Sequence, residues 1–268
     1  MVKSEAPMSH FDFCIIDGTQ YLQDSYALRY EVYCNEQHFL APEDFPSRLE
    51  TDSYDNNSIH VGAINREGGL VGTLRLVLPS ARGFPFYEHC QFFGEYKHLS
   101  SLANPALLSA AEISRLAVSK SYLLTAAEIS RLAVSKSYRR RTNDGLYDLS
   151  SQEDIEIPTG SENEMTLAHR RRRPEIILGL YKTMYQASKR QGITHWFAAM
   201  EKTLLRLLYR YQFGFIPIGP EVDYYGPVTP YLAEIAHIEA GIRQRCPEMY
   251  AEFIQGLEPE LVPEAANR

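Results

Sequence analysis

The sequence predicts an α/β fold in which helices pack around one mixed sheet. Short apolar segments of strand character alternate along the chain with longer amphipathic segments, which is the order expected of such a layered fold. The 268 residues are 44% apolar and 12% aromatic, so there is enough material for a sizeable core. No linker-like stretch divides the chain, and we therefore expect one domain over residues 1–268.

Strands are expected where apolar and β-branched residues cluster between turn residues. Residues 58–65 (SIHVGAIN) and 70–78 (LVGTLRLVL) flank a turn at Arg66–Gly69 and predict a hairpin. Residues 193–199 (ITHWFAA) have the character of a buried strand. Further strands are expected at residues 11–17, 215–219 and 228–235, and one more in the repeat described below.

Helices are expected where apolar residues recur every three or four positions. Residues 20–38 follow this pattern along one side. Residues 175–190 are amphipathic, begin after Pro174, which suits a first helical turn, and end before Gly192, which suits a C-terminal cap. Further helices are expected at residues 201–213 and 236–255, followed by an acidic, flexible tail from about residue 256.

Composition and motifs exclude several classes of function. The chain has 27 Lys and Arg against 34 Asp and Glu, a net charge of −7, which argues against nucleic-acid binding. We expect no transmembrane helix, no signal peptide and no bound metal, because no apolar run approaches 18 residues and the eight His are scattered. Four cysteines outside any C-x-x-C pair indicate free thiols and a cytoplasmic location: Cys14, Cys34, Cys90 and Cys246.

A tandem repeat interrupts the middle of the chain. Residues 107–122 (LLSAAEISRLAVSKSY) and 123–138 (LLTAAEISRLAVSKSY) differ only at Ser109 and Thr125. Two copies of 16 residues are too few for a solenoid and indicate a recent duplication, so one copy fills a core strand. Because the second copy leads toward the next helix, we expect residues 126–135 to be that strand and 110–119 to be the displaced copy.

The repeat is followed by residues 139–173, which we interpret as a mobile surface insertion. The segment is polar and acidic and has few residues that could bury a face. It begins with three arginines, Arg139, Arg140 and Arg141, and ends with four more, Arg170, Arg171, Arg172 and Arg173. Such runs are either solvated or part of an electrostatic docking surface.

Charged residues inside apolar segments are the strongest functional signal. A single buried ion costs several kcal/mol, so these residues should be paired with one another. They form either a salt-bridge network that fixes a loop to the sheet or a binding site, and the two interpretations can both hold. The residues are Arg29, Asp52, Asp55, Arg75, and one of two pairs in the repeat, Glu112 with Arg115 or Glu128 with Arg131.

These residues lie in four motifs, LRYEVY at 28–33, ETDSYD at 50–55, GTLRLV at 72–77 and EISRLAV in the repeat. In this order the motifs resemble the acyl-homoserine-lactone autoinducer synthases. They are still more similar to the N-acyl amino acid synthases and to the acyltransferases associated with PEP-CTERM/exosortase systems. The segment IGPEVDYYGPVTPYLAEI at 218–235 is similar to the exosortase group in particular, and the whole resemblance covers about residues 11–240.

The resemblance implies a GNAT acyltransferase fold, with a mostly antiparallel sheet that splays between the EISR strand and residues 193–199. It implies that Arg29, Asp52, Asp55 and Arg75 shape the acceptor site, and that one Glu–Arg pair of the repeat is catalytic. The acyl donor is expected to be acyl carrier protein, with acyl-CoA as the alternative and no permanently bound cofactor. The usual GNAT pyrophosphate loop is not recognisable after the EISR strand, which disfavours ordinary acetyl-CoA.

Acyl transfer to an amine requires a deprotonated nitrogen, a stabilised oxyanion and a protonated leaving thiolate. A carboxylate near the amine can orient it and relay its proton through water, and backbone N–H groups at a splayed strand can bind the oxyanion. Glu128 or Glu112 is the candidate carboxylate. Strict alternation places Glu and Arg three apart on opposite faces, so both serve one site only if a bulge intervenes; otherwise the Arg pairs with the loop aspartates.

We therefore expect an enzyme that moves a fatty acyl group from acyl carrier protein or acyl-CoA to a small amine, most simply an amino acid. The seven arginines at 139–141 and 170–173 are candidates for docking the acidic carrier. One alternative is synthesis of acyl-homoserine lactone from S-adenosylmethionine. The other is a non-catalytic relative that binds acyl chains or a partner.

Overall fold

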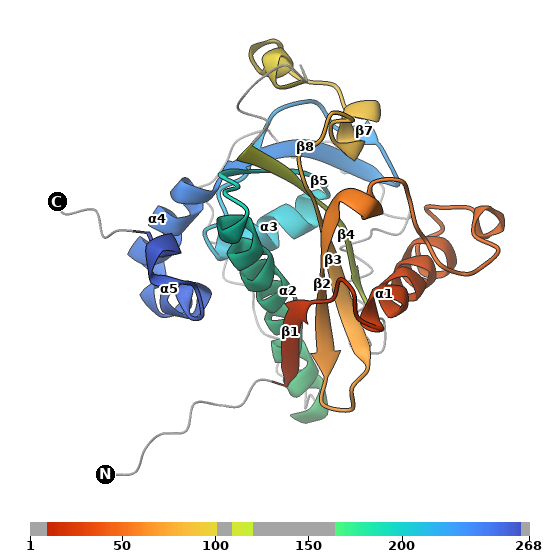
Figure 1. The fold of residues 1–268 in the computed structure, drawn as a ribbon, viewed down its shortest axis with the longest axis horizontal. Helices are drawn as coiled ribbons and strands as arrows, with labels where there is room; N and C mark the ends of the chain where they lie inside the picture. The colour runs from red at the N-terminus through yellow and green to blue at the C-terminus, as the bar shows by residue number, and fades with distance from the viewer. Residues whose placement is uncertain (1–9, 101–108, 120–163, 264–268) are drawn as a thin grey trace.

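The computed structural model describes residues 10–100, 109–119 and 164–263. Their strands lie in the spatial order β1-β2-β3-β4-β5-β8-β6, with β7 also paired to β8 (Figure 1). Only the β4–β5 pair is parallel, which confirms the mixed, mostly antiparallel sheet. The strands are β1 Phe11–Ile15, β2 Ser58–Asn65, β3 Leu70–Val77, β4 Ala110–Val118, β5 His195–Met200, β6 Ile216–Pro217, β7 Val222–Asp223 and β8 Pro227–Glu234.

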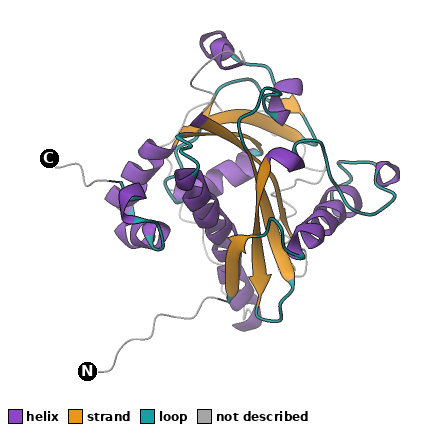
Figure 2. Ribbon diagram, viewed as in Figure 1, coloured by secondary structure: helices purple, strands orange, loops and turns teal. Residues whose placement is uncertain are grey.

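Helices cover both faces of this sheet (Figures 1 and 2). Helix α1 packs on one face of β2–β4, and α2 packs on the other face of β1–β3. The α-helices are α1 Tyr21–Tyr30, α2 Glu164–Arg190, α3 Lys202–Arg210, α4 Ile235–Arg245 and α5 Pro247–Ile254. A π-helical turn, Glu31–Glu36, continues α1, and 3-10 turns lie at Pro42–Asp44, Asp55–Asn57, Pro85–Glu88, Gly94–Ser100 and Pro259–Leu261. None of the helices in these three ranges is long and apolar enough to cross a bilayer.

The apolar core is divided by the sheet. On the α2 side, Leu74, Leu76 and Ile113 of the strands pack against Leu180 and Met184 of the helix. On the other side, Val77, Ala110 and Phe197 pack against aromatic residues of the segment after β3, including Phe84 and Phe86. The two apolar clusters hold β3, β4 and β5 from both faces, so side chains on these strands have fixed positions.

Strands β4 and β5 separate part of the way along their length. Ala110 to Ile113 pair with His195 to Ala198, and beyond these residues β4 pairs only with β3 while β5 pairs only with β8. This divergence confirms the expected splay between the EISR strand and residues 193–199. The place where the two strands part, called the opening below, lies next to the charged residues of β4.

A β-bulge lies on β4 at the same level. Thr73 is paired with Ala117 and Arg75 with Ser114, so two steps along β3 match three steps along β4. Arg115, within the bulge, has a φ of 53°. An extra residue moves the side chains that follow it to the other face of the strand. This is the bulge that Glu112 and Arg115, three residues apart, need in order to serve one site.

The choice of residues 126–135 as the core strand was wrong, because β4 is residues 110–118 of the first copy. Residues 126–134 repeat the β4 sequence, so either copy would make the same contacts within the sheet. The copies differ in the length of the chain that joins them to β3, a difference that changes closure entropy only slightly. The second copy, with Glu128 and Arg131, lies outside the described residues.

Helix α2 begins ten residues earlier than Pro174 suggested, at Glu164, so the expected insertion 139–173 overlaps its first turns. Proline disfavours helix in the residue before it, which made Pro174 a natural start, but the helix continues through this position. The helix expected at 236–255 is two helices, α4 and α5, separated at Cys246, where φ is −139°. After residue 256 the chain returns along α2, where Glu258 Oε1 lies 3.0 Å from Arg190 Nε.

Candidate active site

A cluster of arginines and carboxylates lies on the α1 face of β3 and β4. Arg29 of α1 is 1% exposed, and its Nη1 and Nη2 donate to the two carboxylate oxygens of Asp55 at 2.7 and 3.2 Å. Its Nε donates to Glu50 Oε2 at 2.5 Å. Both acids come from the loop before β2, so α1 and this loop are held together by charge-assisted hydrogen bonds.

Arg75 of β3 attaches the same loop to the sheet. Its Nη1 donates to Asp52 Oδ1 at 2.6 Å and to Asp55 Oδ1 at 2.8 Å, and its Nε donates to Ser114 Oγ at 3.1 Å. Burial alone would raise the pKa of Asp55, but hydrogen bonds from His60 and Arg29 hold this pKa well below its usual range. Asp55 is therefore a permanently ionised centre of the cluster.

Arg115 of β4 completes the cluster. Its Nε donates to Glu50 Oε1 at 3.1 Å and its Nη2 to Asp52 Oδ2 at 3.2 Å. The bulge and the pairing with a loop aspartate, which the sequence left as alternatives, therefore occur together. Three arginines alternate with three carboxylates and balance their charge, and Arg115 is the most exposed arginine, with 10% of its side chain open against 1% for the other two.

Glu112 lies on the same strand but outside these ion pairs. Its carboxyl group is 2% exposed, and its Oε2 accepts a hydrogen bond from the backbone N–H of Phe86 at 3.1 Å. Burial raises the pKa of Glu112 to about 8, because the hydrogen bond from Phe86 and the attraction of Arg75 and Arg115 offset only part of the desolvation. At neutral pH this carboxyl holds a proton in most molecules, which suits a group that exchanges protons.

Three residues of the cluster were not predicted from the sequence: Asp17, Glu50 and His60. Glu50 was quoted within the ETDSYD motif but was not selected. His60 of β2 is 2% exposed and lies between Asp17 Oδ1, at 2.7 Å from Nδ1, and Asp55 Oδ1, at 3.1 Å from Nε2. A polar residue inside the apolar run SIHVGAIN is the same signal that identified Arg75, so His60 could have been found.

Aromatic rings surround the exposed side of Arg115. Its guanidinium carbon lies 5.8 Å from the ring centre of Tyr33, in the π-helical turn, and 5.5 Å from that of Tyr225, in the turn before β8. Tyr33 also donates a hydrogen bond to the carbonyl of Leu116 at 2.9 Å, next to the bulge. The segment Tyr224–Tyr225 thus lies at the edge of the cluster.

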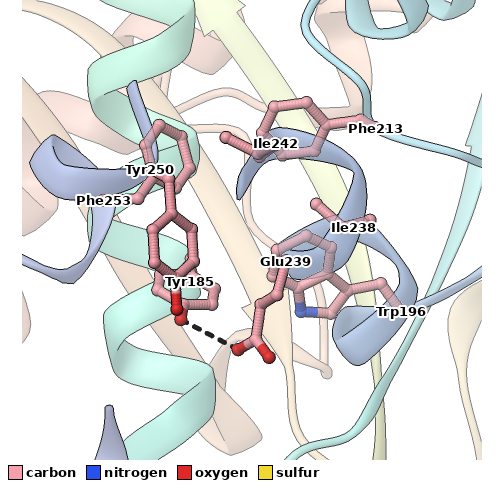
Figure 3. A pocket seen from close by; sticks show the side chains of 8 residues that line it. All are labelled: Tyr185, Trp196, Phe213, Ile238, Glu239, Ile242, Tyr250 and Phe253. Atoms are coloured by element: carbon pink, nitrogen blue, oxygen red, sulfur yellow. Dashed lines mark hydrogen bonds between the residues drawn. The ribbon is translucent and has the colours of Figure 1, made fainter. Parts of the chain in front are cut away.

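The enclosed cavity on the α2 side of the molecule is a different feature (Figure 3). Its volume is about 10 Å³, which is enough for one water molecule and not for an acyl substrate. Tyr185 donates a hydrogen bond across it to Glu239 Oε1 at 2.8 Å, and Lys189 Nζ lies 3.0 Å from the same oxygen. Trp196, beside the cavity, is fully buried, as expected for a core residue.

The arginines considered for carrier docking lie in two parts of the chain. Arg139, Arg140 and Arg141 lie outside the described residues. Arg170 to Arg173 belong to the N-terminal half of α2, which packs on the face of the sheet opposite α1. Their docking role stays a prediction.

Comparison with known proteins agrees with this fold. Residues 28–126, which hold the end of α1, the acidic loop, β2, β3 and β4, match the model of the acetyltransferase (GNAT) domain. No curated protein has a significantly similar sequence.

Solved structures resemble the chain over most of its length. TofI, in a complex with an inhibitor and MTA, is 15% identical with a TM-score of 0.53, and the match covers 95% of this chain and all of that one. BjaI with MTA, a CoA-dependent acyl-homoserine lactone synthase, is 18% identical with a TM-score of 0.51, covering 97% and 94%. The acyl-homoserine-lactone synthase LasI is 13% identical with a TM-score of 0.50, covering 85% and 91%. The chain therefore has a GNAT-like fold, of the form found in the acyl-homoserine-lactone synthases.

Proposed function

We propose that the protein is an N-acyltransferase that moves a fatty acyl group from a thioester donor to the amine of a small acceptor, an amino acid in the simplest case. The observation that carries this proposal is the opening between β4 and β5 beside the buried carboxyl of Glu112 and the exposed side of Arg115. The resemblance of the four motifs to the N-acyl amino acid synthases and the exosortase-associated acyltransferases supports the choice of acceptor.

The opening suits an extended donor. The pantetheine arm of acyl carrier protein or CoA carries two amides, which can pair with strand backbone that lacks a neighbouring strand. Beyond Ile113, β4 has no partner on its β5 side among the described residues. Backbone N–H groups there can stabilise the oxyanion that forms when the thioester carbonyl is attacked. Carrier protein is the preferred donor, with acyl-CoA as the alternative.

Glu112 serves proton transfer in this scheme. When the amine attacks, a carbon–nitrogen bond forms, the carbon–sulfur bond breaks, and the sulfur leaves as a thiolate that needs a proton. A carboxyl with a pKa of about 8 holds a proton at neutral pH and can deliver it, directly or through water. Glu112 then regains a proton from the attacking nitrogen, which must lose one of its two protons to become the amide N–H. The role is therefore that of a proton donor first, rather than the acceptor considered from sequence.

Incubation of the purified protein with acyl donors and amino acids tests the proposal. Free thiol should appear only when both a long-chain acyl-carrier or acyl-CoA thioester and an amino acid are present, and the amide should be found by mass spectrometry. Thiol release that requires S-adenosylmethionine and yields an acyl lactone would establish the autoinducer synthase alternative. No thiol release with any acceptor would favour a non-catalytic protein.

A further inference from the structure

A second carboxyl group, on a half-buried residue, lies near the point where β4 and β5 part and is unused by the scheme above. Glu201 follows β5 directly and is the N-terminal capping residue of α3, but its side chain makes no capping hydrogen bond. Its Oε2 atom is buried and has no hydrogen-bond partner. The adjacent Lys202 is engaged elsewhere, with its Nζ 2.9 Å from Glu221 Oε2. A buried carboxylate oxygen without a partner is costly, so such a group calls for a ligand.

The β4–β5 register places Glu201 at the mouth of the splay. The parallel pairing ends at Ile113 and Ala198; Arg115 lies two residues beyond Ile113 on β4, and Glu201 lies three residues beyond Ala198, directly after the end of β5. Both residues therefore follow the point where the two strands stop pairing, Arg115 on the β4 side and Glu201 on the β5 side. An acceptor entering the splay passes between a carboxyl group and a guanidinium group.

The turn before β8 connects the two groups across the opening. A Cβ atom on Gly226 would lie 3.9 Å from Glu201 Oε1 and 3.2 Å from Phe39 Cε1, so these side chains converge on one point of the turn. The Phe39 ring lies 6.4 Å from that of Tyr33, and Tyr225, next to Gly226, approaches Arg115. Aromatic rings thus line the path from Glu201 to Arg115.

We propose that Glu201 binds the ammonium group of the acyl acceptor and takes its proton. This inference rests on the proposed function and identifies Glu201 as the residue that binds the positively charged end of the acceptor. Burial raises the pKa of Glu201 to about 7, so the carboxylate form is well populated at neutral pH. An ammonium ion is the small cation that a lone carboxylate oxygen beside aromatic rings suits best. Arg115 on the other side favours an acceptor that also carries a carboxylate, as an amino acid does.

The proton balance of the whole reaction follows. The ammonium nitrogen passes one proton to Glu201, and the free amine attacks the thioester carbon. The nitrogen loses its second proton as the carbon–nitrogen bond forms, and this proton replaces the one that Glu112 gives to the leaving sulfur. Glu201 then returns its proton to water, so the net products are amide, thiol and one released proton.

Binding of amino acids, measured by calorimetry without any acyl donor, tests the assignment. Each L-amino acid is compared with its 2-hydroxy acid, which lacks the ammonium group. The wild-type protein should bind at least one amino acid and bind its hydroxy acid about 10–100-fold more weakly, the range expected for one charge-assisted contact. Glu201→Gln, which keeps the shape and removes the charge, should lose the same 10–100-fold for the amino acid. Glu221→Gln, an exposed carboxylate of the neighbouring segment, should leave binding unchanged.

Amino acid binding can be measured whether or not acyl transfer occurs. A wrong role for Glu201 can therefore be distinguished from a wrong proposed function. Equal binding of amino acid and hydroxy acid by the wild type, or unchanged binding in Glu201→Gln, would overturn the proposal. Binding of no amino acid by the wild type would overturn it as well. If Glu201→Gln does not fold, the wild-type comparison and the Glu201→Asp variant, which should retain part of the affinity, decide the question.

Discussion

Replacement of Glu112 by Gln should stabilise the protein, and increasingly so as pH rises. Gln keeps the size of the side chain and can still accept the hydrogen bond from the backbone N–H of Phe86. It cannot ionise, so the desolvation of a buried carboxylate disappears. Because the second copy of the repeat carries Glu128 at the matching position, the variant should combine Glu112→Gln with Glu128→Gln.

The magnitude follows from the pKa of Glu112, which rises from an ordinary value of 4.5 to about 8 in the folded protein. The folded state therefore binds this proton more tightly than the unfolded state, and wild-type stability falls as pH rises from about 4.5 to about 8. At about 1.4 kcal/mol per pKa unit, the loss is about 1 kcal/mol at pH 5, about 3 kcal/mol at pH 7 and close to 5 kcal/mol at pH 9. The double variant lacks this loss.

Urea unfolding of both proteins at pH 5, 7 and 9 measures the effect. The gap in free energy of unfolding should widen by about 4 kcal/mol from pH 5 to pH 9, in favour of the variant. Glu95→Gln, at an exposed carboxylate, should show no such widening. A gap between wild type and double variant that stays constant with pH would refute the argument that Glu112 is buried with its proton.

Three further predictions concern the repeat, the arginine run and the charged cluster. Deleting residues 107–122 leaves Thr at position 109, and deleting residues 123–138 leaves Ser there; the two shortened chains are otherwise identical. Both should fold, with equal melting temperatures and equal activity. Loss of soluble expression would mean that the duplication is not dispensable. Changing Arg170 to Arg173 to Ser should weaken use of an acyl-carrier donor at low salt, less so at high salt, and should spare a small thioester; equal loss with both donors would exclude a docking role. Asp55→Asn should destabilise the protein by about 3–5 kcal/mol in urea unfolding, since it leaves Arg29 and Arg75 short of charge; a change below 1 kcal/mol would contradict the pairing.

The sequence predicted the sheet well because its strands carry strong local patterns. Residues 58–65 and 70–78 alternate around a clear turn, and they match β2 and β3 to within one residue. The first and last residues of the later helices were harder to predict. Pro174 does not begin α2, because the helix tolerates the missing backbone donor, whereas Pro247 does begin α5. Local sequence does not separate these two cases.

The residues that form the charged cluster were easier to predict from the sequence than their arrangement. Burial of charge inside apolar runs identified Arg29 and Arg75, and the cost of burying ions implied that they are paired, as Arg29 is with Asp55 and Arg75 is with Asp52. The sequence indicated that a bulge is needed if Glu112 and Arg115 serve one site. It did not indicate where the bulge lies, because its position depends on the register of β3 against β4. Which copy of the repeat fills β4 could not be inferred, because the two sequences offer the sheet identical side chains.

Mass spectrometry of lipids from cells that express the protein tests the central claim most directly. The wild type should produce a new N-acyl amino acid, and the variant that combines Glu112→Gln with Glu128→Gln should produce much less of it at a similar level of soluble protein. An acyl-homoserine lactone in place of the N-acyl amino acid, or no new lipid from the wild type, would contradict the claim.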